Sequence, residues 1–250
     1  MSKYKILSRQ GQTFLIITFV IIFIVALGVS GWSSGRKYQQ SDKVHLARKT
    51  HALSIFSATI NEDSIKLALK NESDKKINGF QITVNELRVQ VEFLDADEPA
   101  RQVLHPGAIY EQWYQFHPTS KTPEISIQAV VFEDGSSDGD TNMIREIKET
   151  RLGQKMQLQH FIPSLKKALK APDADTIAVL DRLESEILSL EENQSDNLSG
   201  NIKLGIHNEK TRILGMIQQL RRTQQTRGSV QIKKVLVDFQ EKAEKKQSKL

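Results

Sequence analysis

The chain has 250 residues and a mass of 28.4 kDa, and its 38% hydrophobic and 26% charged residues exclude wholesale disorder. Its formal net charge of +5 is unevenly distributed along the sequence. The absence of cysteine excludes disulfides, thiolate metal sites and cysteine nucleophiles, and six scattered histidines leave few ligands for a metal centre.

An uncharged stretch near the N-terminus is the strongest signal in the sequence. Residues 13–32 contain no charged side chain, and a helix of about 20 residues spans the roughly 30 Å of a hydrocarbon core. We therefore predict a transmembrane helix over 13–32, with Trp32 at the headgroup level. An uncleaved signal anchor is favoured over a signal peptide cleaved near Ala26-Leu27-Gly28, because cleaved apolar regions usually run about 7 to 15 residues.

The residues that flank this stretch are basic on both sides. Residues 1–12 include Lys3, Lys5 and Arg9, directly before the apolar stretch, and the polar linker over 33–51 is basic as well. Charge alone does not decide the orientation. A short basic N-terminus before an apolar run is nevertheless the usual export signal, so we expect a single-pass protein of the cell membrane with a cytoplasmic N-terminus and the bulk of the chain extracytoplasmic.

The hydrophobic period becomes two over residues 52–134, which predicts short strands that each bury one face. The expected strands are Leu53 to Ile60; Ile65, Leu67 and Leu69; Phe80, Ile82 and Val84; Leu87, Val89, Val91 and Phe93; Tyr110, Tyr114 and Phe116; and Ile125, Ile127, Ala129 and Val131. The phase slips at Asn85-Glu86, which predicts a turn, a bulge or a strand that changes sheet. Six or seven strands of this kind favour a small antiparallel β-sandwich.

Part of this segment resembles a known family. The run LALKNESDKKINGFQITV is followed by VEFLDAD, then by Leu104, Pro106 and Gly107 and an aromatic strand. These residues resemble the small immunoglobulin-like FxLYD domains of bacterial cell-envelope proteins, over about residues 52–134. The pattern departs from the family at Glu98-Pro99 and at Leu94-Asp95. The resemblance implies a binding or spacer module without catalytic residues.

Carboxylates crowd at one place, the stretch from Glu133 to Asp140. Asp134, Asp138 and Asp140 are oxygen ligands of the kind that a hard cation prefers, but their spacing does not fit an EF-hand. The favoured interpretation is a glycine-rich exit from the last strand into a helix, with Asp140 or Thr141 as the N-cap.

From residue 141 to 250 the hydrophobic period is that of a helix. The apolar stripes are Ile144, Ile147 and Arg151 with Leu158, Phe161 or Ile162, Leu165 and Leu169; Ile177, Leu180, Leu183, Ile187 and Leu190; Ile206, Ile213, Ile217 and Leu220; and Ile232, Val235, Leu236, Phe239 and Ala243. We expect a break or kink at Pro163, a second helix beginning at Ala171-Pro172-Asp173, and another boundary at Thr226-Arg227-Gly228. A local bundle or set of helical hairpins is favoured, with homo-oligomerisation through the helices as the alternative, and short heptad runs add some coiled-coil character.

Basic residues are concentrated at the C-terminal end. Residues 210–250 hold 11 lysines and arginines against three acidic residues. An anionic surface, such as lipid headgroups or an envelope polymer, is therefore a candidate partner, with simple solvation of the basic faces as the alternative. Nucleic acid is a less favoured anion because the aromatic and glycine-rich signatures of RNA-binding folds are missing.

No phosphate-binding loop, nucleophile elbow or zinc-binding histidine pair occurs in the sequence, so we predict no catalytic residue, no cofactor and no metal site. The expected function is that of a membrane-anchored, non-enzymatic envelope protein acting as a binding or scaffolding module. Its expected partners are the bilayer through residues 13–32 and a protein or second copy through the helices of 141–250. The alternatives are a secreted binding protein, a protein whose cytoplasmic basic helices contact nucleic acid, and an enzyme with an unrecognised site.

Overall fold

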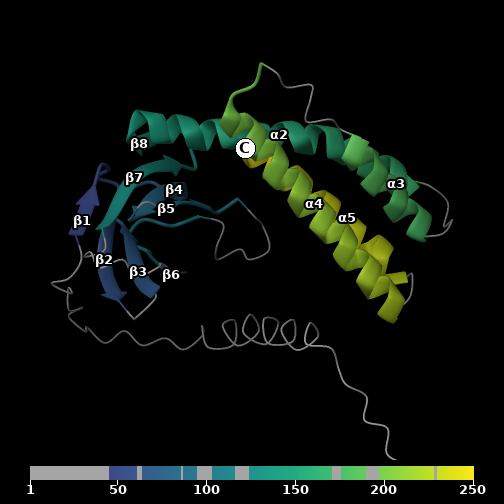
Figure 1. Cartoon of the computed structure of the whole chain (residues 1–250), viewed down its shortest axis with the longest axis horizontal. Helices are drawn as coiled ribbons and strands as arrows, with labels where there is room; N and C mark the ends of the chain where they lie inside the picture. Colours follow the sequence, from purple (N-terminus) through teal and green to yellow (C-terminus); the bar gives the residue numbers. More distant parts are fainter. Residues whose placement is uncertain are drawn as a thin grey trace, which may run out of the picture. The chain divides into compact units, whose positions relative to one another are not determined.

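Two β-sheets are followed along the chain by four helices (Figure 1). The computed structural model describes residues 45–60, 64–85, 87–94, 103–115, 124–170, 176–189, 197–227 and 230–250, all within one compact unit. The strands are β1 (His45–Arg48), β2 (Leu53–Ile60), β3 (Ser64–Asn71), β4 (Ile77–Val84), β5 (Leu87–Glu92), β6 (Ile109–Gln115), β7 (Glu124–Phe132) and β8 (Ser137–Gly139). The helices are α2 (Thr141–Lys170), α3 (Thr176–Ser189), α4 (Gly200–Arg227) and α5 (Val230–Lys249).

The strands form one five-stranded and one three-stranded sheet. The larger sheet has the order β1-β7-β4-β5 with β8 also beside β7, and the smaller one has the order β2-β3-β6. Because β1 pairs with β7 in parallel, the larger sheet is mixed, and the expectation of a purely antiparallel sandwich is wrong. β1 lies inside the expected linker and has mostly exposed side chains, so it shows no alternation that the sequence pattern could reveal.

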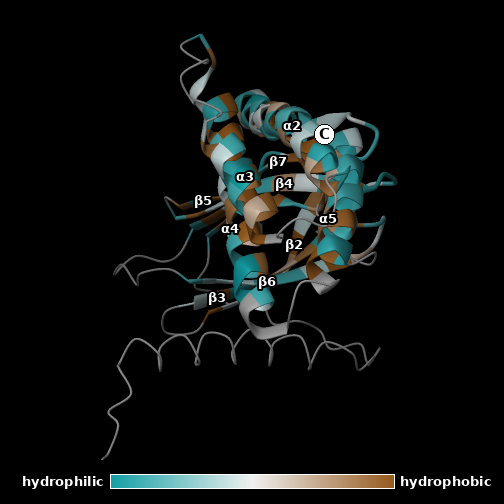
Figure 2. Cartoon of the chain, turned by 90° about the vertical axis from the view of Figure 1, so that its right-hand side faces the viewer, coloured by the Kyte–Doolittle hydropathy of each residue, from teal (hydrophilic) through white to brown (hydrophobic). Residues whose placement is uncertain are grey.

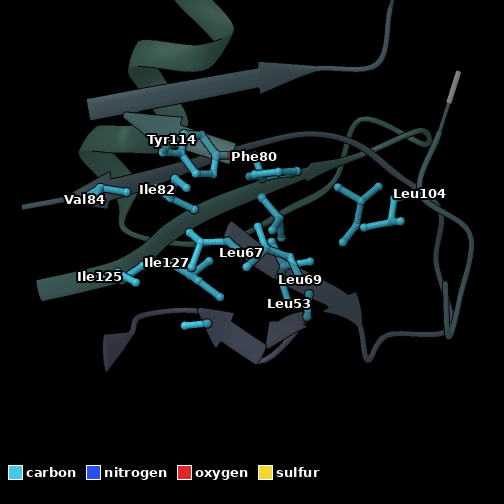
Figure 3. Close-up of a cluster of buried hydrophobic side chains, with 14 of the residues drawn as sticks. Leu53, Leu67, Leu69, Phe80, Ile82, Val84, Leu104, Tyr114, Ile125 and Ile127 are labelled. Carbon is cyan, nitrogen blue, oxygen red and sulfur yellow. The ribbon is translucent and has the colours of Figure 1, made fainter. Parts of the chain in front are cut away.

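The core of the β-region lies between the two sheets (Figure 3). Leu67 and Leu69 from the smaller sheet are fully buried against residues of the larger sheet such as Phe80 and Ile82. The predicted one-sided burial is confirmed for β3, whereas β4 is buried on both faces, with Asn78 and Gln81 buried as well as Phe80 and Ile82. At the predicted slip, β4 and β5 form an antiparallel hairpin in which Val84 pairs with Leu87, and Asn85 adopts a positive φ of 57°.

Strand β7 buries both of its faces, which corrects the single register expected for it. The pairing with β4 shifts between Gln81 and Ile82, so that the phase of β7 changes at Gln128. Residues before and after this irregularity face the sandwich core, namely Ile125, Ile127, Val130 and Phe132. Ala129 and Val131 instead pack in a separate cluster with Ile147 of α2. The alternating positions of the sequence hide this change because every one of them is apolar.

The helices are amphipathic, and Figure 2 shows hydrophilic and hydrophobic residues along each of them. Their buried residues form a cluster that α2, α3, α4 and α5 share, which confirms the expected local packing of the helices on one another. A break at Pro163 is wrong, because α2 is continuous from Thr141 to Lys170. Pro163 is exposed, and buried residues on both sides of it, Phe161 and Leu165, hold the helix in the shared core.

The structure corrects the expected fold class, because the described residues form a mixed α/β unit with a parallel strand pair in its larger sheet. In the part of the chain that the structure describes, no helix is both long enough and apolar enough to cross a membrane. Every described helix carries polar residues along one side, since each packs as an amphipathic element. The predicted span at 13–32 and the expected second-helix start at residues 171–173 lie outside the described residues. A coiled coil is also wrong as a description, because these helices pack against one another within the chain.

Candidate interaction surface

The acidic stretch between β7 and α2 forms hydrogen bonds within the chain. Asp134 accepts hydrogen bonds from the ammonium of Lys75 at 2.8 Å and from the backbone N–H of Ser136 at 2.9 Å, and these donors lower the pKa of Asp134. Asp138 accepts from Oγ1 of Thr50 at 2.5 Å and from the backbone N–H of His51 at 2.8 Å. The two carboxylates thus connect this stretch to the β3–β4 loop and to the β1–β2 loop.

Asp140 is the N-cap of α2, as predicted. One carboxylate oxygen accepts from the backbone N–H groups of Asn142 and Met143 at 3.0 and 3.3 Å, and the other contacts the ammonium of Lys49 at 2.9 Å. Among the described residues, no group of three or more histidine or carboxylate side chains is placed to hold a metal ion.

Replacing Asp138 with asparagine is expected to make the free energy of unfolding less dependent on pH in the acidic range. Burial alone would raise the pKa of Asp138, but the hydrogen bonds from Thr50, His51 and Ala52 outweigh it and lower the pKa below 3.8. A lowered carboxyl pKa stabilises the fold above the unfolded pKa, and the stabilisation is lost as pH falls through the folded pKa. We expect a loss of about 1 kcal/mol at pH 7 that shrinks as the pH falls through the folded pKa of Asp138, measured by urea unfolding at pH 7 and at pH 3. The exposed Asp74→Asn serves as the control, and an equal loss at both pH values would contradict the expectation.

Part of the C-terminal basic charge is used in contacts between helices. Arg221 of α4 forms ion pairs with Asp181 and Glu184 of α3, at 2.6 and 2.5 Å. Lys246 of α5 is buried and contacts Oε2 of Glu209 at 3.0 Å. These pairs connect neighbouring helices, and an anionic partner for residues 210–250 stays a prediction.

A buried charged group joins the β-region to the helices. Arg151 of α2 is 6% exposed, and its guanidinium contacts both carboxylate oxygens of Glu92, at the end of β5, with the shortest distance 2.6 Å. It also donates to the side-chain oxygen of Asn78 at 3.0 Å. Gly79 leaves the space that the guanidinium fills, since a Cβ there would overlap it. In the sequence, Arg151 stands in the otherwise apolar stripe of its helix, and a charged residue at such a position is the signal for a buried ion pair.

Two glycines set the closest approach of α2 and α4. A Cβ on Gly153 would overlap the carbonyl oxygen of Ile202 and lie 2.8 Å from the backbone nitrogen of Ile206. A Cβ on Gly205 would overlap the carbonyl oxygen of Thr150 in the same way. The two helix backbones therefore touch at this crossing, which fixes how the helices are placed.

The main exposed aromatic feature of the β-region lies on β6, at the edge of the smaller sheet. Trp113 is 49% exposed and Ile109 is 44% exposed. The register pairs Trp113 with Lys66 and Ile109 with Lys70 of β3, so both apolar side chains share the outer face of the sheet. Glu111 lies between them on the same face and forms an ion pair of 2.7 Å with Lys66. The strand thus presents an apolar, acidic, apolar pattern at alternate residues.

The backbone N–H and C=O groups of Ile109, Glu111 and Trp113 point to the side of β6 away from β3. The backbone N–H of Asn71, at the end of β3, donates to the carbonyl oxygen of Ala108, directly before β6, at 3.0 Å. The backbone N–H of the next residue, Glu72, donates to the carbonyl oxygen of Ala52, directly before β2 on the other side of β3, at 2.9 Å. Hydrogen bonds alternate between the two sides along an antiparallel strand, so Tyr110, Gln112 and Tyr114 bond to β3. The intervening residues, Ile109, Glu111, Trp113 and Gln115, direct their N–H and C=O groups away from β3.

Three other described edge strands carry features that limit strand pairing, and β6 carries few. β1 has four residues, β2 has an irregular register between Ile55 and Ser57, and Glu92 of β5 contacts α2 through Arg151. β6 has seven residues in regular register, no proline, and Glu111 as its one charged residue. Among the described strands it pairs with β3 alone (Figure 1). The sequence pattern located this strand but gave no indication that it is an edge.

Comparison with known proteins adds no family to this description. No family model, curated protein or solved structure matches the chain. The resemblance to FxLYD domains stays a prediction from the residues that carry it.

Proposed function

We propose that this chain is a non-enzymatic binding module that holds another polypeptide on the β6 edge. The observation that carries the proposal is the exposed face of β6, where the half-exposed Trp113 and Ile109 stand on a strand whose backbone groups at these positions are directed away from β3. Exposed aromatic side chains of this kind are enriched at protein interfaces and often supply a large part of the binding energy.

The distribution of charged groups also supports a binding role over a catalytic one. The carboxylates and bases that attract notice in the sequence have structural partners: Asp140 caps α2, Arg151 contacts Glu92, and Lys246 contacts Glu209. A catalytic site needs a base, a nucleophile and an orienting group that converge on one space. The described charged groups instead connect elements of the fold, and we propose that the helices serve as support for the β-region.

A displayed library of random linear peptides, selected on the full chain, tests this proposal. Binding of the selected peptides is expected to fall at least about tenfold when Trp113→Ser replaces the wild type, because exposed aromatic anchors dominate such interfaces. Leu87→Ser is the matched control, since Leu87 is 53% exposed on a different strand of the β-region. Ile109→Ser provides a second variant should Trp113→Ser change the circular dichroism spectrum.

The selection has two outcomes that would refute the role of β6. The first is the recovery of no peptide above background on the wild-type chain. The second is the recovery of peptides that bind the Trp113→Ser and Ile109→Ser variants as tightly as they bind the wild type.

A further inference from the structure

The open edge of β6 has a specific chemical pattern that a bound polypeptide would have to match. In an antiparallel pair, residues that exchange both backbone hydrogen bonds stand directly opposite each other, with side chains on the same face. An added strand would therefore place alternate side chains opposite Ile109, Glu111 and Trp113. Two of these side chains are half-exposed apolar groups and the middle one is a carboxylate.

Charge determines which residue suits the middle position. Glu111 already contacts Lys66 on the β3 side, and 44% of its side chain is exposed. A lysine or arginine opposite Glu111 would approach the carboxylate from the open side, whereas an acidic residue there would face it directly. Opposite charges across a strand pair are favourable and like charges are unfavourable.

A second copy of β6 does not match this pattern. In the antiparallel register centred on Gln112, Trp113 stands opposite Glu111 of the other copy, and Ile109 stands opposite Gln115. In the register centred on Glu111, the apolar residues meet, but the two Glu111 carboxylates stand directly opposite each other. Each of these two registers therefore contains an unfavourable pair, and we take a different strand as the occupant.

We propose that β6 accepts an extended polypeptide as an additional antiparallel strand, with a basic residue opposite Glu111 and apolar residues two positions before and after it. This inference rests on the proposed function and names the partner class for the same edge. Backbone hydrogen bonds to Ile109, Glu111 and Trp113 hold the added strand, and the alternating side chains give the selectivity.

The test uses a synthetic peptide with the core Val-Thr-Lys-Thr-Val, flanked by threonines, acetylated, amidated and labelled with fluorescein. Its binding to the full chain is measured by fluorescence anisotropy. The N–H groups of the lysine and valines face β6 in the proposed pairing, and those of the two inner threonines face away. N-methylation of the lysine is therefore expected to weaken binding at least about tenfold, and N-methylation of an inner threonine less than about twofold.

A charge exchange tests the pairing with Glu111. A peptide with glutamate in place of lysine is expected to bind the wild-type chain about fivefold more weakly, and Glu111→Lys is expected to restore its binding. Binding of the Val-Thr-Lys-Thr-Val peptide is also expected to be lost on the Trp113→Ser variant. Equal effects of the two N-methylated peptides, or no restoration by Glu111→Lys, would overturn strand addition at this register.

The outcomes separate this inference from the proposed function. If the patterned peptide does not bind while library peptides bind in a Trp113-dependent manner, β6 is a binding surface and the strand-addition pattern is wrong. If neither binds, both proposals fail. If the chain dimerises as concentration rises and Trp113→Ser abolishes dimerisation, a second copy is the occupant and the inference is overturned.

Discussion

Replacing Gly153 with alanine is expected to lower the free energy of unfolding by about 3 kcal/mol, the upper end of what overpacking usually costs. The added Cβ would meet backbone atoms of Ile202 and Ile206, which belong to the other helix and cannot rotate away. The helices α2 and α4 would have to separate. Gly205→Ala is expected to have a similar effect, because its Cβ would meet the carbonyl oxygen of Thr150. Urea unfolding followed by far-ultraviolet circular dichroism measures both changes.

Gly215→Ala is the matched control for this prediction. Gly215 also lies within α4, but a Cβ there would have no atom within 4 Å. Alanine is a better helix former than glycine by about 1 kcal/mol, so this change is expected to stabilise the protein. A loss of stability at Gly215 as large as at Gly153 would show that the two glycines at the crossing have no special role.

Replacing Arg151 with alanine is expected to destabilise the protein by about 3 kcal/mol, because it leaves a largely buried carboxylate without its partner. Glu92 has a side-chain exposure of 19% and contacts Arg151 at 2.6 Å. The change also removes the donor to the side-chain oxygen of Asn78. We further expect the β-region and the helices to unfold separately in the variant, so that tryptophan fluorescence and circular dichroism report different urea midpoints.

A surface ion pair across the same interface provides the control. Arg88 of β5 contacts Glu146 of α2 at 3.2 Å, and 59% of the Arg88 side chain is exposed. Exposed pairs contribute about 0.2 to 1 kcal/mol, so Arg88→Ala is expected to leave stability and the coincidence of the two midpoints nearly unchanged. Equal effects of Arg151→Ala and Arg88→Ala would contradict the assignment of the buried junction.

The elements that the sequence predicted are those whose pattern is local. Ile65, Leu67 and Leu69 alternate with polar or small residues because β3 has one buried face, and this alternation was sufficient to place the strand. The cap at Asp140 was also predicted, because N-capping depends on one side chain and the backbone of the following turn.

The features that the sequence missed depend on contacts between distant segments. β1 has no apolar alternation, and its partner is 79 residues away at the His45–Glu124 pair. Gly153 and Gly205 read only as weak helix formers until the two helices are placed against each other. The open side of β6 could not be predicted either, because strand order is a property of the whole sheet.

Amide hydrogen exchange of the full chain, with and without saturating Val-Thr-Lys-Thr-Val peptide, tests the central claim that the open backbone of β6 holds a polypeptide. Added-strand hydrogen bonds are expected to slow exchange at Glu111 and Trp113 at least about tenfold. Gln112 and Tyr114 already direct their backbone groups to β3, so their exchange is expected to change less than about twofold. Unchanged exchange at Glu111 and Trp113, or equal slowing along the whole strand, would contradict the account.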